Sequence, residues 1–137
     1  MDATPTSAPD AVAAEETAVF DAVSFLARLT GDSDLAKTIL AEFLAHLPKQ
    51  LDRLAGSIAA GEGRQVEAAA HALHGACAAV SGDVVAEVAA AIEAAGKAGD
   101  LAAARSQFAL LQAEATRLAE TICAFPAAAW AASMAAL

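Results

Sequence analysis

Apolar residues recur at helical spacing through five stretches of the chain, separated by short polar or glycine-containing breaks. Within each stretch they follow one another at intervals of three and four residues, which is the period of a helix with one buried face. The pattern predicts helices over residues 18–29, 33–60, 64–80, 84–97 and 101–124.

The second stretch contains Pro48, a residue that breaks or kinks a helix interior. The apolar stripe nevertheless resumes after it and continues to Ile58. We therefore expect one long kinked helix over residues 33–60 and not two short ones. Asp83 and Asp100 are expected to cap the fourth and fifth helices, because a carboxylate can accept hydrogen bonds from the first free backbone amides.

Alanine accounts for 43 of the 137 residues, and tyrosine is absent. Alanine is the best helix former and a poor strand former. Long helices with short connections predict an all-α fold, namely an antiparallel four-helix bundle with an extra N-terminal helix and short tails. We expect residues 1–17 to be a flexible N-terminal tail, residues 18–125 the bundle, and residues 126–137 an Ala-rich C-terminal tail able to form a short helix.

The formal net charge of −9 argues against nucleic acid as a partner, since binding phosphates takes clustered Lys and Arg. The chain has no uncharged apolar run of about 20 residues, and its start lacks the basic and apolar segments of a signal peptide. We therefore expect a cytoplasmic protein without a membrane partner, and a monomer. In that compartment Cys77 and Cys123 are expected to be reduced core residues.

The third predicted helix has an unusual outer face. His71 lies about 140° around the helical wheel from the middle of the buried face, so it points toward solvent. Its neighbours Ala68 and Gly75 have almost no side chain, and His74 lies on the flank. Glycine in a helix interior costs about 1 kcal/mol relative to alanine, so Gly75 indicates close approach by another molecule. The buried face consists of Val66, Ala70, Leu73, Cys77 and Val80.

The six residues Ala70-His71-Ala72-Leu73-His74-Gly75 resemble the Ala-His-x-Leu-Lys-Gly motif of histidine-containing phosphotransfer (HPt) domains. The resemblance covers residues 20–125, most of the chain. It extends to the flanking positions Phe43, Leu47-Pro48, Leu51, Leu54, Val85, Ile92, Glu93, Gly96 and Gly99-Asp100-Leu101.

This resemblance implies a phosphorelay intermediate, a phosphoryl carrier and not an enzyme. His71 would accept a phosphoryl group from the aspartate of one response-regulator receiver domain and pass it to another, in a pathway that begins at a hybrid histidine kinase. The carrier needs no cofactor of its own, because magnesium belongs to the partner receiver domain. The chain has neither a Gly-x-x-x-x-Gly-Lys-Ser/Thr loop nor a glycine-rich nucleotide loop, so autokinase activity is not expected.

Two positions depart from the family pattern. The lysine three residues after the histidine is His74 here, which makes His74 a candidate support for the phosphoryl group but without a fixed positive charge. The glycine expected ten residues after the histidine is Ser81, followed by Gly82. Arg64, two turns before His71, is a further candidate for holding the partner or the phosphoryl group.

Two alternatives remain open at this stage. A metal site could use Glu67, His71, His74 and Cys77, but Cys77 faces the predicted core and one ion could not collect all four ligands; we expect no metal site. The chain could instead be an Ala-rich helical adaptor or protein-interaction module without phosphoryl chemistry. In that case exposed apolar residues around Trp130 would be the docking element.

Overall fold

The computed structural model describes residues 19–137, and within this range the chain forms six helices and no β-strand. The helices are α2 (Ala22–Arg28), α3 (Ser33–Ala60), α4 (Gly63–Ala79), α5 (Asp83–Ala98), α6 (Leu101–Cys123) and α7 (Ala127–Ala135). The N-terminal tail expected over residues 1–17 lies outside the described residues.

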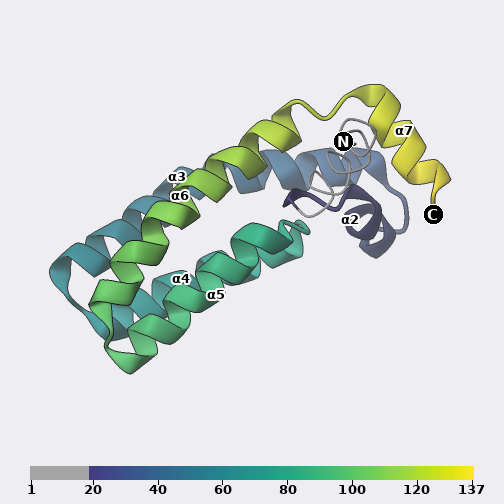
Figure 1. The fold of residues 1–137 in the computed structure, drawn as a ribbon. Coiled ribbons are helices and arrows are strands. Elements are labelled where there is room, and N and C mark those ends of the chain that lie inside the picture. The colour runs from purple at the N-terminus through teal and green to yellow at the C-terminus, as the bar shows by residue number, and fades with distance from the viewer. Residues whose placement is uncertain (1–18) are drawn as a thin grey trace, which may run out of the picture.

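Helices α3 to α6 form an antiparallel four-helix bundle (Figure 1). Each packs on two neighbours, because α4 and α6 both contact α3 and α5. Short connections reverse the chain, and α3 and α5 both end at a left-handed glycine, Gly61 and Gly99, that a side chain would strain. The predicted all-α bundle is confirmed.

The core lies between these four helices and combines aliphatic side chains with buried alanines. Alanine at contact positions lets the helix axes approach closely, and the larger residues fill the remaining space. The largest completely buried side chains of the bundle are Leu54, Leu73, Ile92, Leu111 and Leu118.

Helix α3 runs without interruption through Pro48, as the resumed apolar stripe predicts. It begins where Asp32 accepts a hydrogen bond from the Leu35 amide at 3.0 Å. With 28 residues it is about 42 Å long. It therefore extends beyond the shorter helices α4 and α5 and provides a surface on which α2 packs.

Helices α2 and α7 lie together at one end of the bundle (Figure 1). The Trp130 ring lies 4.8 Å from Phe125 and 6.3 Å from Phe20, centroid to centroid, in edge-to-face arrangements. Only 7% of Trp130 is exposed. Trp130 closes the end of the protein's own core and cannot itself be the docking element of the adaptor interpretation, whereas Met134 and Leu137 of the same tail are exposed.

Helix α2 is shorter than the predicted helix over residues 18–29. Asp21 ends the preceding segment and caps α2, accepting hydrogen bonds from the Ser24 amide at 3.1 Å and the Ser24 hydroxyl at 2.9 Å. A residue that caps a helix has non-helical backbone angles, so an apolar pattern that continues through Phe20 cannot continue the helix.

The prediction that Asp83 caps the fourth helix is also wrong. Asp83 is the first residue of α5, and Gly82 occupies the capping position without a side-chain hydrogen bond. A β-carbon on Gly82 would lie 2.7 Å from the end of the Leu118 side chain, so a larger residue there would force Leu118 of α6 to shift.

The two cysteines differ. Both are free thiols, but Cys77 is buried whereas Cys123 is exposed, so the expectation that both are core residues is wrong for Cys123. Burial raises the pKa of the Cys77 thiol to about 12. Cys77 therefore stays protonated and chemically inert.

Arg28 ties α2 to the end of α4. Its guanidinium donates to the carbonyl oxygens of Ala78 and Ala79 and to the Ser81 hydroxyl. Ser81 has a φ of 59°, a left-handed conformation that glycine adopts without strain. That conformation gives a physical reason for the family's glycine at this position, and Arg28 holds the serine that replaces it.

No single helix among the described residues is long and apolar enough to cross a membrane. Only α6 and α7 taken together meet the length and composition requirements, and they are bent by 92° relative to each other.

Candidate functional site

His71 lies on the exposed face of α4, where the helical wheel places it. Its side chain is 73% exposed. Ala68 and Gly75, one turn before and after it, are exposed as well, and a β-carbon added to Gly75 would meet nothing within 4 Å. His71 therefore lies between two small, exposed residues of its own helix, Ala68 and Gly75, on a surface that a partner can approach.

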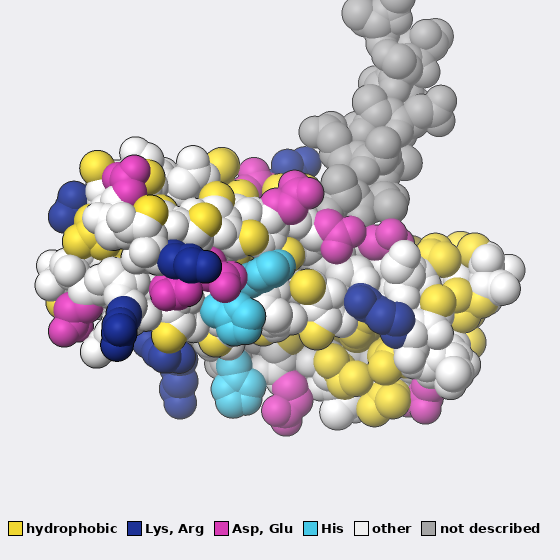
Figure 2. Space-filling view, turned by 90° about the horizontal axis from the view of Figure 1, so that it is seen from below, with side chains coloured by type: hydrophobic (Ala, Val, Ile, Leu, Met, Phe, Trp, Pro, Cys, Tyr) yellow, Lys and Arg dark blue, Asp and Glu magenta, His cyan; other side chains and the backbone are white. Residues whose placement is uncertain are grey.

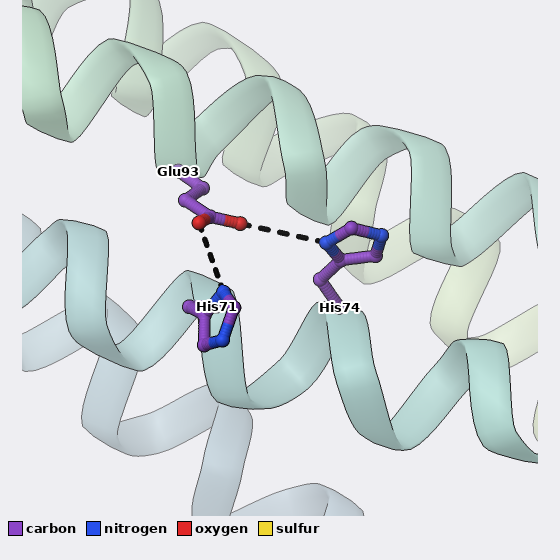
Figure 3. Close-up of side chains that lie close together, drawn as sticks. All are labelled: His71, His74 and Glu93. Atoms are coloured by element: carbon purple, nitrogen blue, oxygen red, sulfur yellow. Dashed lines mark hydrogen bonds and ion pairs between the residues drawn. The ribbon is translucent and has the colours of Figure 1, made fainter.

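The His71 ring is held from one side by Glu93 of α5 (Figure 3). His71 Nδ1 lies 2.9 Å from Glu93 Oε2. A carboxylate can only accept, so Nδ1–H donates the hydrogen bond. A neutral imidazole carries a single N–H. Its lone pair is then on Nε2, which makes Nε2 the nucleophilic atom of His71.

The same carboxylate contacts His74. His74 Nδ1 lies 3.4 Å from Glu93 Oε1, and the His74 side chain is 40% exposed. Glu93, 27% exposed, thus joins two histidines that lie three residues apart on one face of α4. The structure brings His71 and His74 together through a residue of the next helix.

Glu93 is the functional candidate that the sequence analysis did not single out. It appeared there only as one position of the family resemblance, because its partner lies 22 residues away on another helix. The sequence does contain one indication of its role. Gly96 is a glycine in an Ala-rich helix, which indicates close packing against another helix, and Glu93 lies one turn before it.

The close crossing of α4 and α5 sets the distance between His71 and Glu93. A β-carbon on Gly96 would lie 2.7 Å from the Glu67 nitrogen and 2.9 Å from the Gly63 carbonyl oxygen. Only glycine fits at this contact. Since His71 follows Glu67 by one turn, the crossing brings the Glu93 carboxylate within hydrogen-bonding distance of the ring.

An open hollow lies beside the His71 ring, lined by Arg64, Glu67, Ala68, His71 and Glu93. Figure 2 shows histidine side chains gathered beside acidic and basic side chains on this face of the molecule. Arg64 is exposed and brings a positive charge to the hollow. The hollow therefore combines one positively charged side chain, Arg64, with two carboxylates, Glu67 and Glu93, next to the imidazole.

The four-residue metal set considered from sequence does not assemble. Cys77 is completely buried, on the opposite side of α4 from His71. Within the described residues the group that could hold a metal ion is instead His71, His74 and Glu93, whose ligand atoms all lie within 4.8 Å of one another.

Comparison with known protein families identifies one match. The Hpt domain family matches residues 38–121, which span most of α3 and continue nearly to the end of α6. His71, His74, Gly75 and Glu93 all lie inside this range. No curated protein and no solved structure shows significant similarity to the chain.

Proposed function

Because the chain belongs to the histidine-containing phosphotransfer family, whose domains carry phosphoryl groups on histidine in two-component systems, we propose that His71 is the phosphoacceptor. The observation that carries this proposal is the orientation of the ring. Glu93 engages Nδ1 at 2.9 Å while the side chain is 73% exposed, which leaves Nε2 free for a partner.

The transfer step needs no proton acceptor on this chain. The Nε2 lone pair attacks the phosphorus of a receiver-domain aspartyl phosphate, the N–P bond forms, and the bond from phosphorus to the aspartyl oxygen breaks. The aspartate leaves as a carboxylate with the bonding electron pair. His71 keeps its proton on Nδ1, so its ring becomes positively charged, and the Glu93 carboxylate stabilises that charge.

The reverse step delivers the phosphoryl group to another receiver. An aspartate oxygen attacks the phosphorus, the N–P bond breaks, and the electron pair returns to Nε2. The same hydrogen bond to Glu93 serves both directions, because it stabilises the imidazolium-like ring without consuming a proton. Phosphoryl transfer depends mainly on alignment and charge neutralisation, and the receiver domain would bring magnesium for the latter.

Two residues of this chain would contribute further charge. Arg64 lines the hollow next to His71 and could attract the phosphoryl oxygens. His74 occupies the place of the family's lysine, and its Nδ1 faces Glu93 at 3.4 Å. A histidine there supplies positive charge only when protonated, so the support from this position depends on pH.

The experiment is incubation with a phosphorylated receiver domain, followed by analysis for a phosphate that is stable to base and labile to acid. His71→Gln should abolish labelling and leave the helical circular dichroism spectrum unchanged. His46→Gln is the matched control, because His46 is also exposed on a helix and lies beside a glutamate, at 3.6 Å from Glu42. Labelling that persists in His71→Gln would contradict the proposal.

A further inference from the structure

We propose that His71, His74 and Glu93 bind a divalent transition-metal ion such as Zn²⁺, and that the bound ion prevents His71 from accepting a phosphoryl group. One ligand atom of each residue lies within 4.8 Å of those of the other two. The inhibitory effect rests on the phosphoacceptor role proposed above, whereas the metal site itself does not.

The ligand atoms of this cluster, within 4.8 Å of one another, lie near the spacing of a tetrahedral site. Zinc bonds of about 2.0–2.2 Å place neighbouring ligand atoms about 3.3–3.6 Å apart in a tetrahedron. The two histidine nitrogens lie 2.9 and 3.4 Å from the oxygens of Glu93. Side-chain rotations that bring the ligand atoms from within 4.8 Å to the tetrahedral spacing would place one ion between them. Two histidines and a carboxylate leave a fourth position for water, as in open zinc sites.

Helices α4 and α5 hold the three ligand side chains close together before an ion binds. His71 and His74 lie three residues apart on α4, a spacing at which both rings can face one point beside the helix (Figure 3). Glu93 approaches from α5, which the Gly63–Gly96 crossing keeps close. All three side chains are at least partly exposed, so an ion can enter directly from solvent.

The bound ion would change the tautomer of His71. Without metal, Nδ1 carries the proton that faces Glu93, and Nε2 carries the lone pair. A metal ion needs the Nδ1 lone pair, so the ring proton must move to Nε2. Nε2 then has no lone pair with which to form the N–P bond. Metal binding and phosphoryl acceptance would thus exclude each other.

Zinc titration by calorimetry tests the site directly, using the full chain and ZnCl₂. We expect one Zn²⁺ per chain, with affinity at least about tenfold lower in His74→Gln and in Glu93→Gln. The control His46→Gln, which removes an exposed histidine paired with a single glutamate, should bind zinc as the wild type does. Absence of binding, or equal affinity in all variants, would overturn the metal site.

The tautomer can be read from nitrogen-15 NMR of the His71 ring in the same samples. We expect the proton on Nδ1 without zinc and on Nε2 with saturating zinc. A ring that keeps its Nδ1 proton in the zinc-bound protein would overturn the proposed ligand set.

A phosphorylation assay then tests the inhibition, with phosphoramidate as a small phosphodonor that removes any effect of zinc on a receiver. At a free zinc concentration about ten times the wild-type Kd, wild-type phosphorylation should slow about tenfold, whereas His74→Gln, at most about half occupied, should slow no more than about twofold. An unchanged wild-type rate would overturn the inhibition. If His71 is not phosphorylated even without zinc while zinc still binds, the proposed function fails and the metal site stands.

Discussion

Gly96 lies directly against the backbone of Glu67, with room for no side-chain atom, since a β-carbon on Gly96 would lie 2.7 Å from the Glu67 nitrogen. His71 lies one turn after Glu67 on α4, and Glu93 lies one turn before Gly96 on α5. These two side chains form a hydrogen bond of 2.9 Å. A contact between two backbones therefore determines how the candidate phosphoacceptor is oriented.

Gly96→Ala should push α5 away from α4. The added methyl group meets backbone atoms, which cannot rotate aside, so we expect a loss of about 1–3 kcal/mol in the free energy of unfolding. Phosphotransfer should slow as well, because the His71–Glu93 distance increases. Denaturant unfolding and transfer rates measure both effects. Gly75→Ala is the matched control, since the open space at Gly75 should make it slightly stabilising. Equal stability changes in the two variants would contradict the close-contact account.

Glu93→Gln should slow transfer to His71 without changing the fold. The glutamine oxygen can still accept from Nδ1–H, but the negative charge that stabilises the phosphorylated ring is lost. Charge-assisted hydrogen bonds are roughly twice as strong as neutral ones, so we expect a decrease of about tenfold in rate. The rate of transfer from a phosphorylated receiver measures this. A wild-type rate in Glu93→Gln would show that the carboxylate has no part in the transfer.

Gly75→Leu should impair docking of the receiver domain without lowering the stability of the fold. Leucine is a better helix former than glycine, and a β-carbon at this position meets no neighbour, so the free energy of unfolding should not fall. The larger side chain would stand one turn from His71 and obstruct a receiver. We expect slower receiver-to-His71 transfer but normal phosphorylation by phosphoramidate. Wild-type transfer from the receiver would refute the close-approach role of Gly75.

His74→Lys should make transfer less sensitive to pH. A lysine stays charged throughout the neutral range, whereas an imidazole changes its charge between about pH 5 and 8. The test is a comparison of the pH profiles of the variant and the wild type. We expect the variant to lose part of the pH dependence of both the transfer rate and the phosphohistidine lifetime. Superimposable pH profiles of the variant and the wild type would show that His74 does not contribute to the pH dependence.

The sequence was sufficient to predict the bundle because its evidence is local and periodic. The stripe that resumes after Pro48 predicted a continuous α3, and the wheel predicted an outward-facing His71. The start of α2 was missed because the Asp21 side chain caps the helix within an apolar stretch. The cap depends on a single residue, whereas the periodic pattern is an average over several residues. The pattern therefore does not show where the helix begins.

Contacts between distant segments could not be predicted in the same way. The Glu93 partnership depends on the crossing of α4 and α5, which the sequence indicates only through isolated glycines. The burial of Trp130 depends on α7 turning back toward Phe20, more than 100 residues earlier in the chain. Neither relationship has a periodic signal along the sequence.

The central claim is that the phosphoryl group is carried on Nε2 of His71. The most direct measurement is NMR of the phosphorylated protein with nitrogen-15 in its histidine rings, recorded through the phosphorus-31 coupling. The account predicts one phosphohistidine, at His71, with phosphorus on Nε2 and the proton retained on Nδ1 toward Glu93. Phosphorus on Nδ1, or on any other residue, would contradict it.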